Sequence, residues 1–382
     1  MHVVQVANFY GPHSGGLRTT MQELGRGYQA RGHQATLIVP GEYHDDEQTP
    51  WGRRITIAAS RVPGAGGYRI ISDLDRLVAI LDEIKPDRLE VSDRTTLRCL
   101  GWWAAASGVP AFMWAHERVD GVLSAFLPGP WPSRFMADVW NRSTVRRFER
   151  VVCTTEFAAA EFDRIGWRGV THVPLGVDLD MFNPQLRDEQ FRSELLGPGI
   201  DTLVVLCSRL SKEKRPMDAF DTLSALRRRG VRARLVVMGT GPLDAKLRKL
   251  ARRLPVTMLG HCSERAQVAR VLAAADVVLS PGPIETFGLA ALESLASGTP
   301  VVACQSSAVG EVIAGGGGIV SPPCPEHYAD SVLAVLAEPE SVRRAAARKR
   351  AEEFPWSRTV DALLSLHGAS GCSVADDLRR VG

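Results

Sequence analysis

Two carboxylates, Glu285 and Glu293, stand eight residues apart, on either side of the start of a run that reads as a helix. The first backbone N–H groups of a helix have no partner within it, so a helix start is a ready site for an anion. One element can therefore offer carboxylates to hydroxyls and N–H groups to phosphate, a set that suits a nucleotide-sugar. The N–H groups in question belong to Phe287, Gly288 and Leu289.

A basic loop forms a second candidate site. Arg209 and Lys214 directly follow the strand expected at Thr202–Cys207. Arginine offers a planar fork of donors to a diphosphate, whereas lysine offers a point charge. Alone, this loop could equally be a solvated basic surface. Its combination with the two downstream glutamates favours a diphosphate site.

Two weaker signals lie in the first half of the chain. Gly15 and Gly16 separate the first expected strand from the first expected helix, where glycines let a backbone approach a ligand closely. A flexible loop is the alternative interpretation. His116 follows the strand expected at Ala111–Ala115. A lone histidine there is more often a packed polar residue.

Short apolar runs alternate with helical patterns along the chain, which predicts parallel sheets covered by helices. The pattern is interrupted near Pro174 and Gly176 and then restarts, so we expect two Rossmann-like doubly wound domains facing a cleft, with the boundary after residue 175. The expected strands are Val3–Ala7, Ala35–Val39, Arg88–Val91, Ala111–Ala115, Val151–Thr154 and Val170–Val173, then Thr202–Cys207, Arg234–Met238, Val256–Leu259, Val277–Leu279, Val301–Ala303 and Gly318–Val320.

Composition narrows the class of protein. The chain has 382 residues and is 45% hydrophobic and 23% charged, as in globular proteins with substantial cores. A net charge of +3 argues against a nucleic-acid partner. Seven scattered cysteines without a C-x-x-C pair argue against a disulfide framework or a zinc site and favour a reduced, cytoplasmic setting. We expect no signal peptide and no membrane-spanning segment.

The residues from Glu285 to Glu293 resemble the E-x7-E motif of retaining glycosyltransferases of family 4, which have the GT-B fold. The loop Ser208–Lys214 resembles the G-R-L-x-x-E-K loop of that family, with serine in place of the first glycine. The resemblance implies that Arg209 and Lys214 neutralise a leaving diphosphate and that Glu285 binds hydroxyls of the transferred sugar. Glu293 would bind the ribose.

The same resemblance assigns further residues. The Gly15–Gly16 loop would face the donor, and His116 would lie against the donor sugar near the reacting centre. Glu117 and Arg118 adjoin His116 and could face the acceptor. Backbone groups around Cys262 would read the nucleotide base. The resemblance also implies three segments: residues 1–175 bind the acceptor, residues 176–355 bind the nucleotide-sugar, and residues 356–382 comprise a helix that crosses back to the first domain and a polar tail.

The resemblance further implies a reaction without metal and without a cofactor, in which the sugar is replaced on the same face. Two D-x-D runs, Asp73–Asp75 and Asp178–Asp180, could suggest a metal site, but the first opens an expected helix and the second lies at the domain joint. We therefore interpret both as structural, and we expect the charge of the diphosphate to be compensated by Arg209, Lys214 and helix-start amides.

The stretches at residues 4–12 and Leu89–Arg94 resemble actinobacterial mannosyltransferases that use GDP-mannose on phosphatidylinositol mannosides. The expected partners are then a nucleotide-sugar donor and a glycolipid or other hydroxyl acceptor. A UDP- or ADP-sugar with a soluble acceptor, a non-catalytic sugar-nucleotide sensor and a nucleotide-sugar epimerase remain alternatives. An epimerase would need a second pair of proton-transferring carboxylates, which the sequence does not suggest.

A lipid acceptor would require a membrane surface. Residues 122–150 mix aromatic and basic side chains, which favours contact with an anionic interface at the inner face of the plasma membrane. An amphipathic helix packed on the sheet is the alternative. The residues concerned are Leu123, Phe126, Leu127, Trp131, Phe135 and Trp140, with Arg134, Arg142, Arg146, Arg147 and Arg150.

Overall fold

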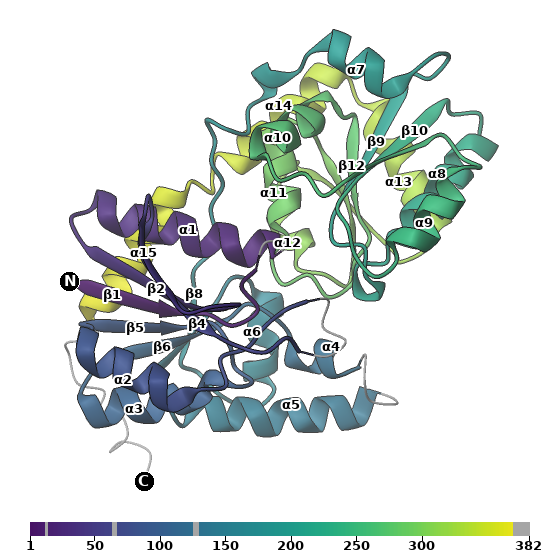
Figure 1. Ribbon diagram of the computed structural model, residues 1–382. Helices are drawn as coiled ribbons and strands as arrows, with labels where there is room; N and C mark the ends of the chain where they lie inside the picture. Colours follow the sequence, from purple (N-terminus) through teal and green to yellow (C-terminus); the bar gives the residue numbers. More distant parts are fainter. Residues whose placement is uncertain (12–13, 63–66, 125–129, 370–382) are drawn as a thin grey trace. The chain divides into compact units, whose positions relative to one another are not determined.

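The protein is described by a computed structural model that covers residues 1–11, 14–62, 67–124 and 130–369. The chain forms two compact units, each with its own sheet and helices (Figure 1). One unit is Gly176–Pro355, and the other is Met1–Leu175 with the segment that begins at Trp356. Within the described ranges, no helix has both the length and the apolar character needed to span a bilayer.

The first unit has an eight-stranded sheet in the order β3-β4-β2-β1-β5-β6-β7-β8. Every strand predicted for this half is present, with ends shifted by at most two residues, and all of these strands pair in parallel. The bounds are β1 His2–Val6, β2 Gln34–Gly41, β3 Asp45–Thr49, β4 Gly52–Ala58, β5 Arg88–Val91, β6 Ala111–Ala115, β7 Arg150–Cys153 and β8 Val170–His172.

Strands β3 and β4 were not predicted from the sequence. Strand β4 extends the parallel sheet beside β2, and β3 runs antiparallel to β4. Ion pairs cross the hairpin from Arg53 to Asp46, at 2.6 Å, and from Arg54 to Glu47. Because β3 is polar and largely exposed at the sheet edge, it lacks the apolar pattern by which strands are recognised.

Helices cover both faces of this sheet. Residues of α2 and α3 pack in one apolar cluster with the central strands, whereas Leu17 and Met21 of α1 pack in another. Helix α15, near the end of the chain, packs on α1 so closely that a Cβ on Gly27 would lie 2.3 Å from a Val360 methyl carbon. The helices of this unit are α1 Gly15–Ala30, α2 Leu74–Ile84, α3 Leu100–Ser107, α4 Val119–Ser124, α5 Pro130–Val145, α6 Glu156–Asp163 and α15 Trp356–Ala369.

A buried polar cluster joins α15 to the sheet. The fully buried Glu90 on β5 pairs with His367 on α15, at 2.8 Å. The same carboxylate accepts hydrogen bonds from Tyr28 on α1, at 2.5 Å, and from Gln5 on β1, at 2.9 Å. Removing one partner of a buried pair leaves an uncompensated charge, so this cluster fixes α15 to the first unit.

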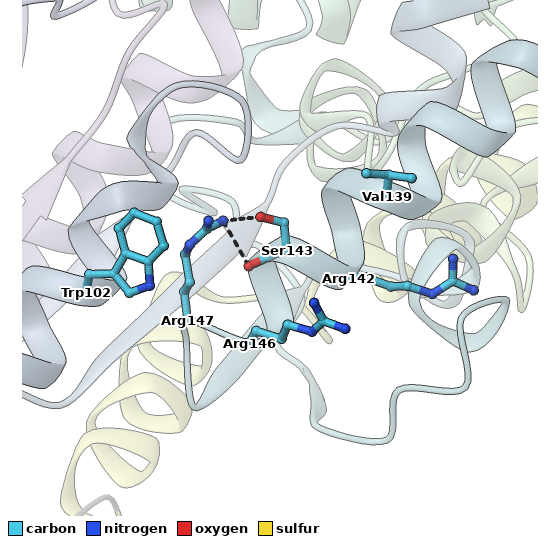
Figure 2. A pocket seen from close by; sticks show the side chains of 6 residues that line it. All are labelled: Trp102, Val139, Arg142, Ser143, Arg146 and Arg147. Atoms are coloured by element: carbon cyan, nitrogen blue, oxygen red, sulfur yellow. Dashed lines mark hydrogen bonds between the residues drawn. The ribbon is translucent and has the colours of Figure 1, made fainter.

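The outer surface of α5 carries a shallow hollow of ≈ 420 Å³ shared with α3 and the segment after α5 (Figure 2). Figure 2 shows Trp102 beside Arg147, whose guanidinium bonds Ser143, while Arg142 and Arg146 extend away from that pair. The Arg147 guanidinium carbon lies 4.1 Å from the centre of the Trp102 ring. The hollow is thus lined by aromatic and cationic groups.

The second unit has a six-stranded parallel sheet in the order β11-β10-β9-β12-β13-β14. Numbered from one within the unit, this is the order 3-2-1-4-5-6 of a dinucleotide-binding Rossmann sheet, whose ligand lies where the order reverses. Here that switch point lies between β9 and β12. All predicted strands of this half are present: β9 Thr202–Cys207, β10 Ala233–Met238, β11 Val256–Gly260, β12 Val277–Ser280, β13 Val301–Cys304 and β14 Gly318–Ser321.

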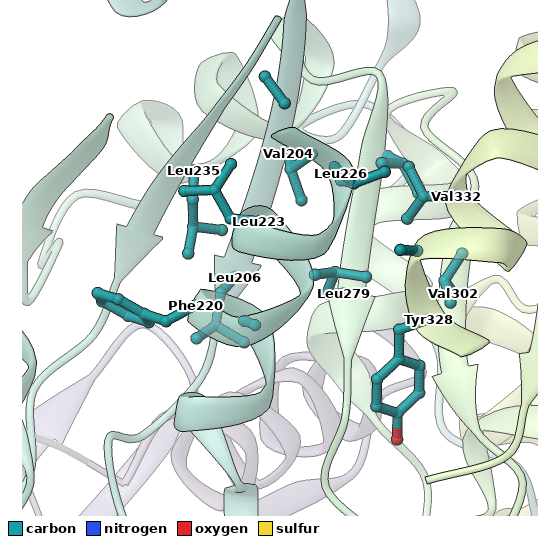
Figure 3. Packing of buried hydrophobic residues seen from close by; sticks show 14 of the residues in the cluster. Val204, Leu206, Phe220, Leu223, Leu226, Leu235, Leu279, Val302, Tyr328 and Val332 are labelled. Atoms are coloured by element: carbon teal, nitrogen blue, oxygen red, sulfur yellow. The ribbon is translucent and has the colours of Figure 1, made fainter. Parts of the chain in front are cut away.

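The core of this unit lies between its sheet and helices on one face. Phe220, Leu223 and Leu226 from one helix pack with Leu206 and Leu279 of the sheet (Figure 3). Their full burial makes this sheet a rigid base for the loops at its edge. The helices of the second unit are α7 Glu189–Leu196, α8 Pro216–Arg228, α9 Asp244–Ala251, α10 Arg265–Ala274, α11 Leu289–Ala296, α12 Val309–Ile313, α13 Pro325–Ala337 and α14 Glu340–Ala351.

Two arginines on α14 hold the helix that follows Glu285. Arg348 donates to the carbonyl of Ala296 at the end of α11, at 2.9 Å, and Arg344 donates to Ser297, at 3.1 Å. Cations at the carboxyl end of a helix satisfy carbonyls that lack an intrahelical partner and complement the helix dipole. Helix α11 is thus fixed at its far end, which fixes the direction of its N-terminus.

Candidate active site

The loop after β9 is shaped by two glycines of the next βα turn. A Cβ on Gly239, whose φ is +131°, would lie 2.0 Å from the carbonyl oxygen of Ser208, and one on Gly241 would lie 2.5 Å from that of Leu210. Only glycine tolerates both this φ and this contact. The Leu210 N–H also donates to the carbonyl of Thr240, at 3.0 Å. These contacts fix the backbone that carries Arg209 and Lys214.

The loop after β12 carries Glu285 and ends at a second constrained glycine. The carbonyl of Glu285 accepts the Ala308 N–H, at 2.9 Å. Gly288 is the N-cap of α11 with φ of +92°, and a Cβ there would lie 2.6 Å from a Val309 methyl carbon. Glycine at this position therefore lets the loop turn into the helix while it stays packed on α12.

The N-terminus of α11 offers backbone N–H donors to a ligand. Among the residues that the structure describes, no side chain caps this helix end, and the Gly288 carbonyl accepts the N–H groups of Ala291 and Leu292. The first N–H groups of a helix have no intrahelical acceptor, so those of Leu289 and its neighbours are the donors available to an anion. Phe287 is 4% exposed and packs edge-on against Phe354, and this contact holds the turn before α11 in place.

Lys214 and Glu285 meet across the switch point. The Lys214 Nζ lies 2.6 Å from a Glu285 carboxylate oxygen, and both side chains remain partly exposed. The Pro281–Pro283 turn is close enough that a Cβ on Gly282 would lie 3.3 Å from the Cα of Lys214. A partly exposed ion pair contributes only about 0–1 kcal/mol, so a ligand can replace it at little cost. Both groups are thus oriented in advance and remain available.

Glu293 lies on α11 beside a residue that the sequence analysis did not identify. Its carboxylate is 3.1 Å from the guanidinium of Arg265, the first residue of α10. Burial raises the pKa of Glu293, and Arg265 opposes this effect. No sequence signal marks Arg265, because only the packing of α10 against α11 brings it to the site.

Cys207 lies near both Glu293 and Cys262. Burial, with nearby Glu293 and Cys262, raises the pKa of the Cys207 thiol to about 12. The Cys262 thiol lies 4.0 Å from the carbonyl oxygen of Gly260, and burial also raises its pKa. A raised pKa favours the neutral thiol, so these cysteines act as small apolar groups.

His116 lies at the carboxyl end of β6 in the first unit. Its ring stacks on Trp114, with 4.9 Å between centres, and its Nε2 lies 3.3 Å from the Ser92 hydroxyl oxygen. Burial and the charge of Arg94 lower the pKa of His116 to about 4. The imidazole is thus neutral near pH 7 and suited to hydrogen bonding with a neutral hydroxyl.

The two glycines after β1 begin α1. A Cβ on Gly15 would have no heavy atom of the described residues within 4 Å, so these residues do not require glycine there. The Ser14 side chain bonds Gly11, at 2.8 Å, and does not cap α1. Gly15 and Gly16 are both exposed. The open helix start and the missing side chains leave room for an approaching ligand.

The predicted site residues therefore fall into two groups, each organised within its own unit. Gly15, Gly16 and His116 lie at the carboxyl edge of the first sheet. The second unit carries Arg209, Lys214, Cys262, Glu285, Phe287, Gly288, Leu289 and Glu293 on loops and helix starts that follow its strands. Both D-x-D runs bind backbone: Asp73 accepts the Arg76 N–H, and Asp178 accepts those of Asp180 and Met181.

Two protein families match the chain along most of its length. Residues 187–353 match the model of glycosyl transferases group 1, and residues 14–181 match that of glycosyltransferase family 4. The two matches cover the second and the first unit respectively, so both units point to the same kind of enzyme.

Individual relatives agree with these matches. The chain is 46% identical to a GDP-mannose-dependent alpha-(1-6)-phosphatidylinositol dimannoside mannosyltransferase of Mycobacterium tuberculosis. The match covers 98% of this chain and 97% of that protein. It is 32% identical to a D-inositol 3-phosphate glycosyltransferase of Saccharomonospora viridis, over 70% of this chain and 67% of that one.

Solved structures share the fold. Sucrose-phosphate synthase from Thermosynechococcus elongatus superposes with a TM-score of 0.78 at 18% identity and covers 97% of this chain and 98% of its own. WaaG, a glycosyltransferase involved in lipopolysaccharide biosynthesis, superposes with a TM-score of 0.72 at 18% identity. The match covers 95% of this chain and 99% of WaaG. The fold class predicted from the sequence is thus confirmed, with the β3–β4 hairpin as an addition. This chain has the GT-B fold and belongs to the family 4 glycosyltransferases.

Proposed function

We propose that this enzyme transfers mannose from GDP-mannose to a glycolipid acceptor of the phosphatidylinositol mannoside type, with retention of configuration and without a metal ion. The observation that carries this proposal is the 46% identity to the mycobacterial mannosyltransferase, which extends over almost the whole of both chains. The geometry of the second unit supports it, because Lys214 and Glu285 meet at the switch point of a nucleotide-binding sheet.

The proposed donor contacts follow from the chemistry of each group. Arg209, Lys214 and the N–H groups at the start of α11 bind the diphosphate. Arg209 offers a cationic fork of donors, Lys214 a point charge, and the helix start the positive end of its dipole. Glu285 accepts hydrogen bonds from hydroxyls of the mannose. Glu293 accepts those of the ribose, while Arg265 keeps its carboxylate in place.

The proposed reaction relies on positioning and charge stabilisation. The acceptor hydroxyl attacks the anomeric carbon as the bond to the diphosphate breaks. The hydroxyl proton passes to the departing diphosphate oxygen on the same face, so configuration is retained and no protein base is required. Arg209 and Lys214 stabilise the charge that develops on the diphosphate. The neutral imidazole of His116 can bind a sugar hydroxyl, which its low pKa favours.

The donor base is the first point to test. In a thermal-shift panel, GDP should raise the melting temperature more than UDP or ADP at equal concentration, because a ligand at 100 times its Kd stabilises the folded state by about 2.7 kcal/mol. With GDP-mannose that carries a radiolabelled mannose, the label should then be transferred to a phosphatidylinositol dimannoside acceptor. Preference for UDP or ADP would favour a different sugar donor, whereas binding without any transfer would favour a sugar-nucleotide sensor.

We also propose that the first unit contacts an anionic membrane surface through α5, at the inner face of the plasma membrane. The residues of α5 that face the protein are small or polar, such as Ser133, Ala137 and Asn141. Three large apolar ones face solvent: Trp131, Phe135 and Val139 are 77%, 57% and 47% exposed, whereas Val145 at the end of the helix packs against the core. This is the reverse of a helix that merely packs on a sheet, and such an exposed stripe marks an interaction surface.

Cations continue this stripe. Arg142 and Arg146 line the hollow in Figure 2, and neither forms an ion pair within the described part of the chain. Burial and the charge of Arg147 lower the pKa of Arg98, whose guanidinium carbon lies 5.4 Å from the centre of the Trp140 ring. A cluster of like charges favours an anionic partner such as phospholipid headgroups. Phe126 and Leu127, also expected at this interface, lie outside the described residues.

Vesicle binding tests this proposal. The protein should sediment with phosphatidylglycerol vesicles and much less with phosphatidylcholine vesicles. The double variant Trp131→Ser, Phe135→Ser should bind the anionic vesicles at least tenfold more weakly, because about 25 cal/mol is lost per Å² of apolar surface no longer buried. Val342→Ser, an exposed apolar position in the second unit, serves as the control. Equal binding by the double variant and this control would contradict the assignment of α5.

A further inference from the structure

Three loops meet at the carboxyl edge of the first sheet, around its own switch point between β1 and β5. They carry Asn8 after β1, Asp93 and Arg94 after β5, and His116 and Glu117 after β6. The Asn8 side chain donates to Asp93, at 3.1 Å, which ties the first two loops together. Ligands of such sheets bind at this edge, so the state of each charged group here bears on what it can hold.

Two of the carboxylates at this edge are fully used by the protein. Asp93 accepts hydrogen bonds from the backbone and hydroxyl groups of Thr95 and Thr96 in addition to Asn8. The buried Glu161 on α6 accepts the N–H groups of Val119 and Asp120, at 3.0 and 2.8 Å. Their acceptor capacity is largely occupied, and neither needs a ligand.

The nearby cations are also committed. The Arg94 guanidinium, 1% exposed, pairs with Glu161 at 3.1 Å and donates to the Asn141 side chain at 2.9 Å. Arg118 pairs with Asp120, at 2.8 Å. Both arginines thus already pair with a carboxylate other than Glu117.

Glu117 is the exception. Its backbone carbonyl accepts a hydrogen bond from Arg94, but its carboxylate has no hydrogen-bond or ion-pair partner among the described residues. The side chain is half-buried in the segment between β6 and α4, next to His116. Burial and the negative charge of Asp93 raise the pKa of Glu117 to about 7, although Arg94 opposes this effect. A half-buried carboxyl group without a partner is a strong candidate for ligand binding.

The surroundings also restrict the kind of ligand. An anionic ligand group would face Asp93 and Glu161 as well as Glu117, so a phosphate contact is disfavoured. A metal ion would need further oxygen ligands, but those of Asp93 and Glu161 already accept hydrogen bonds from the protein. A neutral hydroxyl group can donate to the free carboxylate without either problem, and the neutral His116 beside it can bind a second one.

We propose that Glu117 binds the acceptor, accepting a hydrogen bond from a hydroxyl of its polyol headgroup and thereby selecting for a hydroxyl at that position. This inference rests on the proposed function in one respect, since it takes the first unit to bind a hydroxyl acceptor. It goes further in naming the side chain and its chemistry. Glu117 is an acceptor-binding residue here and takes no part in binding the diphosphate.

Steady-state kinetics with phosphatidylinositol dimannoside test this role. Glu117→Gln should raise the acceptor KM at pH 8 about tenfold, because a charge-assisted hydrogen bond is roughly twice as strong as a neutral one. For the wild type, the acceptor KM should rise about tenfold from pH 8 to pH 6, as the carboxylate becomes protonated below a pKa of about 7. The variant should lack this dependence. His116 stays neutral over this range.

Two controls separate this role from a structural one and from the donor site. Glu83→Gln, at an exposed position on α2, should leave the acceptor KM unchanged. The affinity of Glu117→Gln for GDP should equal that of the wild type, since Glu117 has no assigned contact with the nucleotide. An unchanged acceptor KM and pH profile in Glu117→Gln would overturn the proposal.

A binding measurement keeps the inference testable if the glycolipid proves to be the wrong acceptor. With ¹³C-labelled glutamate, the carboxyl signal that disappears in Glu117→Gln should titrate near pH 7. Saturating myo-inositol should lower that midpoint, because a hydroxyl donor stabilises the carboxylate. A midpoint that inositol and soluble mannosides leave unmoved would refute hydroxyl binding at Glu117. Failure of the wild type to transfer mannose would instead refute the proposed function.

Discussion

Glu285→Ala should lose at least a hundredfold in kcat/KM for mannose transfer while it still binds GDP within about threefold of the wild type. The proposed role of this carboxylate is to hold hydroxyls of the transferred sugar, and each hydrogen bond to a charged group contributes about 1.5–3 kcal/mol. Two such bonds correspond to a loss of about 10²–10⁴. The substitution also removes the partner that orients Lys214, at 2.6 Å.

The control for this variant is Glu326→Gln, which alters an exposed carboxylate on α13 that pairs with Arg228 and Arg229. It should keep wild-type activity and melting temperature. The measurement is initial rates with GDP-mannose for both variants, with circular dichroism to show that each is folded. More than a tenth of wild-type activity in a folded Glu285→Ala protein would remove the sugar-binding role of Glu285.

Lys214→Ala should weaken GDP binding by ten- to a hundredfold, while its affinity for guanosine stays the same. The difference isolates the diphosphate, because guanosine lacks the charges that Lys214 is proposed to neutralise. Lys212, two residues earlier in the same loop, provides a matched control with the same charge and side chain. Lys212→Ala should bind GDP as the wild type does, since Lys214 and not Lys212 pairs with Glu285.

Isothermal titration of GDP and guanosine against both lysine variants gives the comparison directly. An increase in ionic strength should reduce the difference between wild type and Lys214→Ala, because salt screens partly exposed charges. If the two lysine variants lost affinity equally, the loop would act as a diffuse basic surface, and the specific assignment of Lys214 would be wrong.

Most of the sheet could be predicted from the sequence because buried parallel strands are apolar along their whole length. Runs such as Thr202–Cys207 and Ala111–Ala115 coincide with β9 and β6. The β3–β4 hairpin could not be predicted, since Asp45–Thr49 is polar and lies at an exposed edge of the sheet, where it pairs with β4. Apolar periodicity records burial, and an edge strand has little of it.

The sequence predicted which residues of the loops and helix starts belong to the candidate site. The structure shows which of these residues contact one another. The pairing of Lys214 with Glu285 requires that β9 and β12 be neighbours, which depends on the strand order and not on local pattern. Arg265 was missed for the same reason, as it reaches Glu293 only through the packing of α10 on α11. That the Glu117 carboxylate has no partner within the described ranges becomes evident only once the partners of Asp93, Arg94 and Glu161 are known.

The central claim is that the second unit binds the diphosphate of a nucleotide-sugar between the β9 loop and the start of α11. A crystal structure of the protein with GDP-mannose tests it most directly. Diphosphate oxygens should lie about 2.7–3.2 Å from Arg209, from Lys214 and from the first N–H groups of α11, with a mannose hydroxyl on Glu285. Nucleotide density away from these groups, or a diphosphate on a different loop, would contradict the account.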